Sequence, residues 1–182
     1  MLDRLTSAYH LHPIVDHFTI ALLASGIAAE ILATAAMLIS RGQWDWLSRW
    51  SQKLDGTSLL LMISGAAATV LSYFTGDVEA DRLWDSISPS AQHVLASSDG
   101  AGRYLSHAAL GQYLMYTFVV LAAWRVMVEF SARLSRWRIA YLMVAAVAAC
   151  ALIYQGKTGG ELVYEQGVGT SMSVSAPATE QR

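Results

Sequence analysis

Four apolar segments, each close to the length that crosses a bilayer, constrain the fold of this chain more than any other feature. The segments are residues 13–40, 58–74, 103–124 and 138–154. About 20 apolar residues in a helix span the hydrocarbon core of a membrane. The chain is 54% hydrophobic and only 14% charged, unlike the composition of soluble domains. We therefore predict an all-α fold, a four-helix transmembrane bundle.

All four segments belong to one predicted domain, residues 1–169, and a small, polar tail over 170–182 is expected to be disordered. Between the second and third segments, residues 78–87 and 89–95 have the patterning of short amphipathic helices.

Several glycines follow the fourth segment. Gly156 is expected to end the helix there, because glycine commonly follows the last helical turn. Gly159 and Gly160 are then expected to form a turn, so that residues 162–164 fold back over the end of the bundle.

Basic and aromatic residues gather in the connections between the first and second segments and between the third and fourth. The basic ones are Arg41, Arg49, Lys53, Arg125, Arg133, Arg136 and Arg138. Positively charged connections stay on the cytoplasmic side of a membrane. Both termini and the acidic connection over 76–102, with its short helices, are therefore expected on the outer, periplasmic face. The net charge of −2 predicts no surface for nucleic acid.

Two histidines lie at matching depths in helices that are both expected to start outside. His17 and His107 each come about four residues inside their segments, roughly 6 Å along the helix axis. Two neutral imidazoles that face each other across a bundle are the axial ligands that a b-type haem (heme b) requires. Small residues follow His17 on the same face at Ala21, Ser25 and Ala28, which would give a flat macrocycle room.

The same pattern has a structural explanation. Small residues let membrane helices pack closely, and histidines at helix entries form hydrogen bonds in the headgroup region. A third interpretation is a metal site outside the membrane, formed by His12 with His10, Asp16 and His17, because imidazole and carboxylate suit Zn²⁺ or Cu²⁺. Against that interpretation, His12 is explained equally well as the start of the first helix, and Asp16 as a favourable first-turn charge.

Glu30 lies near the middle of the first apolar segment. A charge costs a few kcal/mol there, so the carboxyl group should be neutral, paired or directed into the bundle. It lies about 220° around the helix from His17 and does not share its face. The simplest expectation is a neutral carboxyl group bonded to a hydroxyl such as that of Ser64 or Tyr116.

Three motifs carry a resemblance to a known family. They are His12-Pro13 with His17-Phe18-x-Ile20-Ala21-Leu22, then His107-Ala108-Ala109-Leu110-Gly111, and finally Gly159-Gly160-x-Leu162-Val163-Tyr164-x-x-Gly167-Val168-Gly169. Together they resemble the bacterial membrane proteins grouped as domain of unknown function 2231. Two positions differ from the family: Thr19 replaces a common proline, and Asp16 replaces an apolar residue. The resemblance implies a four-span domain of the bacterial inner membrane, sometimes joined to Rieske or c-type cytochrome domains, and so suggests electron transport.

The leading hypothesis is an integral membrane subunit of a respiratory or photosynthetic electron-transfer assembly, with a b-type haem between His17 and His107 near the periplasmic face. Its partners would be the lipid bilayer and other membrane subunits, including cytochrome or Rieske-type redox proteins. The alternative is a structural subunit without a cofactor that packs against a larger complex. No nucleophile, base and orienting acid can be assembled from the sequence, so we expect no independent catalytic activity.

Overall fold

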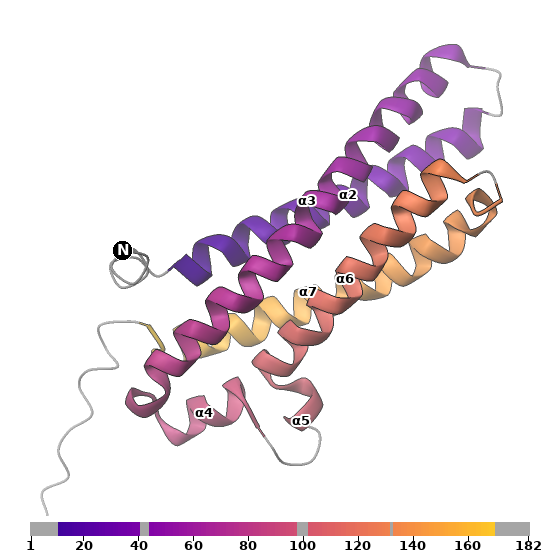
Figure 1. The fold of residues 1–182 in the computed structure, drawn as a ribbon. Coiled ribbons are helices and arrows are strands. Elements are labelled where there is room, and N and C mark those ends of the chain that lie inside the picture. Colours follow the sequence, from indigo (N-terminus) through magenta and orange to yellow (C-terminus); the bar gives the residue numbers. More distant parts are fainter. Residues whose placement is uncertain (1–10, 41–43, 98–101, 132, 170–182) are drawn as a thin grey trace, which may run out of the picture.

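A computed structural model describes residues 11–40, 44–97, 102–131 and 133–169, and within these residues every regular element is a helix (Figure 1). The elements are α2 (Leu11–Ser40), α3 (Asp45–Leu83), η1 (Trp84–Ser86), α4 (Pro89–Leu95), α5 (Gly102–Leu105), α6 (His107–Phe130), η2 (Ser135–Trp137) and α7 (Arg138–Tyr164). The predicted all-α class is confirmed, and α2, α3, α6 and α7 are long and apolar enough to cross a membrane. The predicted tail over 170–182 and His10 lie outside the described residues.

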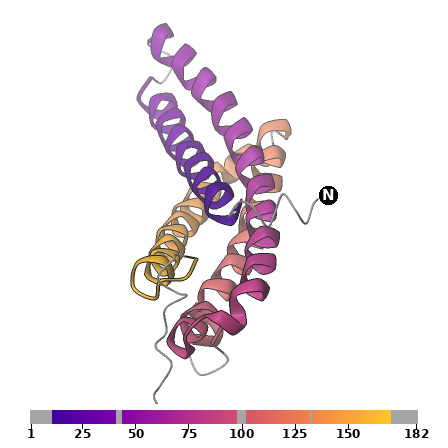
Figure 2. The same cartoon turned by 90° about the vertical axis from the view of Figure 1, so that its left-hand side faces the viewer.

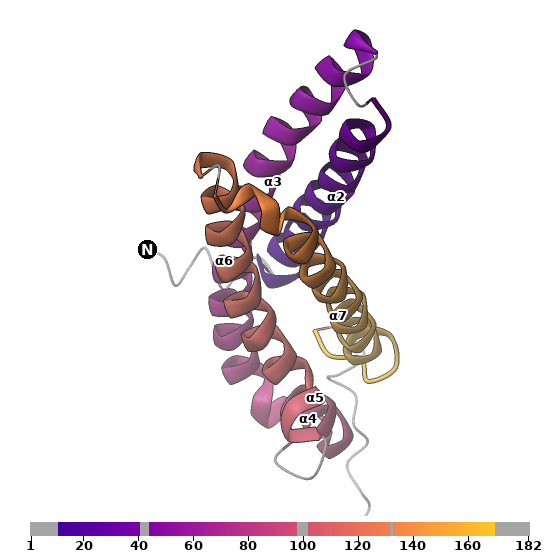
Figure 3. The same ribbon diagram turned by 90° about the vertical axis from the view of Figure 1, so that its right-hand side faces the viewer.

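The four long helices form two antiparallel hairpins, α2 with α3 and α6 with α7. Between the hairpins, α3 packs against α6 and α2 against α7. Figures 2 and 3 show that the α2–α3 hairpin projects beyond the α6–α7 hairpin at one end of the molecule, the end where α2 is joined to α3 and α6 to α7. We call this the hairpin end. The opposite end, where α2 and α6 begin and α3 and α7 end, is called the histidine end.

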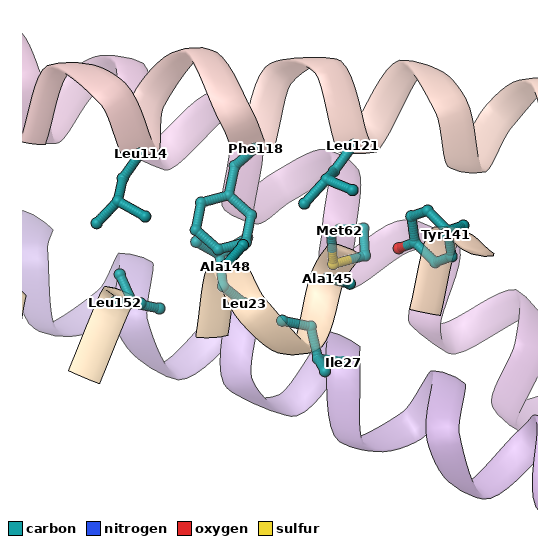
Figure 4. Packing of buried hydrophobic residues seen from close by; sticks show 10 residues of the cluster. All are labelled: Leu23, Ile27, Met62, Leu114, Phe118, Leu121, Tyr141, Ala145, Ala148 and Leu152. Atoms are coloured by element: carbon teal, nitrogen blue, oxygen red, sulfur yellow. The ribbon is translucent and has the colours of Figure 1, made fainter. Parts of the chain in front are cut away.

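The core between the hairpins is formed by all four long helices (Figure 4). Its buried residues are Leu23, Ile27, Met62, Leu114, Phe118, Leu121, Tyr141, Ala145, Ala148 and Leu152. Small residues bring α2 and α3 close together, since a Cβ atom added at Gly65 would lie only 2.5 Å from Leu23 Cδ2. Large aliphatic and aromatic side chains such as Phe130, Val147 and Ile153 point outward, as expected for helices that face lipid.

The ends of α3 and α7 differ from the prediction. The helix does not stop at Gly156, because α7 continues through Gly159 and Gly160 to Tyr164. The chain turns only after that, where Gly167 has a positive φ of 68° and the Val168 N–H donates to Leu162 O at 2.9 Å. The glycines of α7 therefore serve the packing of the helix and do not terminate it.

The segment after the second span is partly as predicted. Residues 78–83 are helical, but they continue α3 and do not form a separate helix. The second short helix is present as α4, and the Ser88 hydroxyl caps it by accepting a hydrogen bond from Ala91 N at 3.2 Å. Ile87 and Ala91 then pack against Leu162, so that α4 lies against the last turns of α7.

Candidate functional site

The histidine end brings two imidazoles together from different hairpins. His12 lies in the first turn of α2, and His107 is the first residue of α6. Their ring centroids are 6.4 Å apart and their planes are inclined by 82°. Two titratable rings therefore meet at the place where all four long helices converge.

Hydrogen bonds fix the tautomer of both rings. His12 Nδ1 lies 3.0 Å from Ser72 O, and because a carbonyl oxygen only accepts, Nδ1 carries the proton. His107 Nδ1 lies 3.0 Å from Thr158 Oγ1. The Thr158 hydroxyl already donates to Gln155 O at 2.9 Å, so its oxygen accepts from His107. Both imidazoles consequently have an unprotonated Nε2, and that of His107 accepts a long hydrogen bond of 3.4 Å from Gln155 Nε2.

Gln155 adds an unusual acceptor to this group. Its Nε2 donates to His107 O at 3.0 Å and lies 3.4 Å from His107 Nε2. The amide nitrogen of Gln155 must face the His107 carbonyl oxygen, and this fixes the orientation of the Gln155 side-chain amide. Its Oε1 is then buried, and none of the described residues donates a hydrogen bond to it. Buried acceptors are normally satisfied, so this oxygen is available to accept a hydrogen bond from a bound water or ligand.

Glycines give the two rings their space. A Cβ atom added at Gly76 would lie 2.8 Å from His12 Cε1, and one added at Gly159 would lie 3.0 Å from His107 Cε1. Any side chain at either position would push the neighbouring ring away. Asp16 extends the site on the α2 side, since its Oδ1 accepts a hydrogen bond from the Ser72 hydroxyl at 3.0 Å.

His17 lies elsewhere. It follows His12 by five residues, about 140° around a helix, and it is exposed, with Nδ1 2.6 Å from Pro13 O. The small face that begins at His17 also points outward, because Ala21 is exposed like the ring itself. The structure thus places His12, and not His17, beside His107. Among the described residues, no three His, Cys, Asp or Glu side chains gather as a metal site would require.

A second polar cluster lies toward the hairpin end and is centred on Glu30, which is fully buried. Arg125 Nε donates to Glu30 Oε2 at 2.8 Å, and Arg138 Nη2 lies 2.6 Å from Glu30 Oε1. The Ser58 hydroxyl also binds the carboxylate. The expectation of a neutral carboxyl group bonded to Ser64 or Tyr116 was therefore wrong, because two guanidinium groups pair with Glu30.

Arg125 is the central residue of this cluster. We call the cluster the ion cluster, and its charged members are Glu30, Asp55, Arg125, Glu129 and Arg138. Besides Glu30, Arg125 binds Asp55 Oδ1 at 2.7 Å and Glu129 Oε2 at 2.9 Å, and its side chain is fully buried. Arg138 also pairs with Asp55. The two arginines counted in the basic connections thus lie between the hairpins. Tyr141 lies close enough to interact electrostatically with the cluster, but its buried hydroxyl has no hydrogen-bond partner among the described residues.

Two of these residues escaped the sequence analysis. Gln155 and Thr158 are polar residues directly after the fourth apolar segment, and they are three apart on one helix face. That spacing was a usable signal. The partners of Glu30 could not be named in the same way, since nothing local relates Arg125 or Arg138 to it.

The comparison with protein families agrees with the motifs described above. The family model for "Predicted membrane protein (DUF2231)" matches residues 8–172. No curated protein and no solved structure matches the chain. Since the family match covers most of the sequence, including the four long apolar helices and both histidines of the site, the protein belongs to the DUF2231 family of predicted membrane proteins.

Proposed function

We propose that this protein is an integral membrane subunit of an electron-transfer assembly and that it holds a b-type haem at the histidine end, with His12 and His107 as axial ligands. The observation that carries the proposal is the pair of imidazoles from two hairpins, 6.4 Å apart, each with Nδ1 engaged. His12 takes the place that the sequence analysis gave to His17, because the His17 ring is exposed on the far side of its helix turn.

The donor set fits the group. His12 and His107, whose ring centroids are 6.4 Å apart, would hold the iron through imidazole nitrogens, the donors that a b-type haem takes from proteins. Gln155 stands closest to His107 Nε2, at 3.4 Å, so its amide must turn aside for a ligand to approach. A b-type haem would supply one-electron transfer.

The chain's own residues hold and orient the ligands. Ser72 O and the Thr158 hydroxyl accept the Nδ1 protons of the two histidines, which keeps each Nε2 unprotonated and fixes the ring rotation. Leu152 and Leu114 of the core lie on the side of the site toward the middle of the helices. Such an apolar wall excludes water, and a low dielectric tunes the potential of a bound redox group.

The proposed location is the bacterial inner membrane, with the histidine end and both termini on the periplasmic side. Exposed basic residues at the hairpin end, including Arg49, Lys53, Arg133 and Arg136, support a cytoplasmic position for that end. A haem near the periplasmic face would exchange electrons with a redox protein there, such as a cytochrome or Rieske domain.

The test is the visible spectrum of the protein, purified from haem-replete cells and recorded oxidised and reduced. We expect a Soret band and reduced b-type peaks that are lost in His12→Ala and in His107→Ala. His17→Ala is the matched control, because it makes the same change in the same helix, and it should keep the spectrum. A colourless wild-type protein overturns the haem proposal and favours the structural subunit. A spectrum lost only in His17→Ala overturns the choice of His12.

A further inference from the structure

The first turns of α3 carry an exposed stripe of alternating aromatic and basic residues. Trp46, Arg49, Trp50 and Lys53 are spaced by three, one and three residues, so they share one face of the helix. All four side chains are exposed, Trp46 by 54% and Trp50 by 57%. This basic–aromatic stripe is distinct from the histidine end, which lies at the other end of the molecule.

The two cations of the stripe form no ion pair within the part of the chain that the structure describes, unlike the arginines of the ion cluster. Arg125 and Arg138 bind carboxylates between the hairpins, whereas neither Arg49 nor Lys53 forms an ion pair with any described residue. Lys53 Nζ lies 5.7 Å from the centre of the Trp50 ring, an attractive cation–π arrangement. Asp45, one turn before Arg49, interacts favourably with the helix start, and Asp55, two residues after Lys53, pairs with Arg125 and Arg138.

The register of α2 and α3 fixes the depth of the stripe. Ser51 Oγ donates to Ala33 O at 2.9 Å, so the two helices are level at these residues. Because the helices run antiparallel, the stripe lies level with the part of α2 from about Ile31 to Leu38. Ile31 and Leu38 are 48% and 58% exposed, which is expected of side chains in contact with lipid. The cations therefore lie beside exposed apolar side chains of α2.

We propose that the basic–aromatic stripe binds the phosphate group of an anionic phospholipid. Arg49 and Lys53 pair with the phosphate, and the rings of Trp46 and Trp50 occupy the interfacial layer beside it. The occupant follows from charge complementarity, since two unpaired cations at the depth of the headgroups require anions. Tryptophan is also the side chain that prefers this layer. Basic side chains near a membrane surface each favour anionic over neutral lipid by about fivefold.

Lipid retention tests the proposal. The full chain is purified, exchanged into micelles that contain equal amounts of phosphatidylglycerol and phosphatidylcholine, and examined by native mass spectrometry for the lipids that remain bound. We expect the wild type to retain phosphatidylglycerol preferentially. Arg49→Gln and Lys53→Gln should each reduce that preference by about fivefold, and added salt should weaken it in the wild type.

Lys157→Gln is the matched control, because Lys157 is an exposed cation at the histidine end and its replacement removes the same charge. The control should retain the wild-type preference. An unchanged preference in both stripe variants, with helicity intact by circular dichroism, overturns the proposal. An equal loss in Lys157→Gln also overturns it, since the preference would then depend on total charge and not on the stripe.

Discussion

Removing the hub of the ion cluster should destabilise the protein strongly. Arg125→Met keeps most of the side-chain volume but takes away the cation that binds three carboxylates. Asp55 keeps Arg138 as a partner, and Glu129 is 36% exposed, so neither becomes a buried charge without a counterion. Glu30 is fully buried and keeps only Arg138 and a hydroxyl as partners. Breaking a buried pair from one side costs about 3–5 kcal/mol, and we expect a loss of free energy of unfolding in that range.

Two companion variants separate the causes. Glu129→Gln removes only the partly exposed pair with the same arginine and should cost less than about 1 kcal/mol. In the double variant Glu30→Met/Arg125→Met, the buried carboxylate goes together with its partner. The double variant should therefore be at least about 2 kcal/mol more stable than Arg125→Met alone, since apolar replacement of both members of a buried pair is often tolerated.

The assay is unfolding in mild detergent micelles by increasing fractions of a denaturing detergent, followed by far-ultraviolet circular dichroism. All variants are measured under the same conditions, so that differences in the free energy of unfolding are compared. If Arg125→Met costs no more than Glu129→Gln, the guanidinium group does not bind a buried carboxylate, and the reasoning fails. The same conclusion follows if the double variant is less stable than the single one.

Three further substitutions test the packing at single positions. Gly76→Ala should lower the free energy of unfolding by about 1–3 kcal/mol, because the added methyl group displaces His12. Gly56→Ala is its control: the added methyl group meets no atom within 4 Å, so the change should be neutral or stabilise α3 by up to about 1 kcal/mol. Equal effects of the two substitutions would contradict the close approach of His12 to Gly76. Tyr141→Phe removes a buried hydroxyl without a partner and should leave the unfolding midpoint unchanged or raise it, and a clear loss would mean that the hydroxyl is bonded. Ser58→Ala removes a hydrogen bond to a buried carboxylate and should lower the free energy of unfolding by about 1.5–3 kcal/mol, while a neutral result would place the carboxylate elsewhere.

The rotation of the first helix explains which part of the site the sequence could predict. Four apolar segments and two histidine-bearing helix starts followed directly from the pattern, but the choice between His12 and His17 depended on which face of α2 points inward. The position of Glu30 indicates that face. It comes eighteen residues, about five full turns, after His12, so the two side chains lie on the same face of α2. A buried carboxylate in the first segment thus implies an inward His12 and an outward His17.

Helix ends were the least predictable feature of the fold. The second apolar segment was predicted to end at residue 74 and the fourth helix at Gly156, yet α3 and α7 both continue past these positions. The deciding contacts are long-range, since the rings of His12 and His107 pack on Gly76 and Gly159. Local preference cannot distinguish a glycine that ends a helix from one that admits a neighbouring ring. The partners of Glu30 were hidden for the same reason, because Arg125 is 95 residues away in the chain.

The ion cluster divides its charges unequally between the two hairpins. The α2–α3 hairpin contributes Glu30 and Asp55, while the α6–α7 hairpin contributes Arg125 and Arg138, with Glu129 offsetting one of them. Either hairpin alone in a membrane would hold charges without counterions, which hydrocarbon disfavours by several kcal/mol. Each hairpin thus favours a neighbour that carries charges of the opposite sign at the same depth, as its counterpart in this chain does. Correct pairing during membrane insertion is therefore selected by charge as well as by shape.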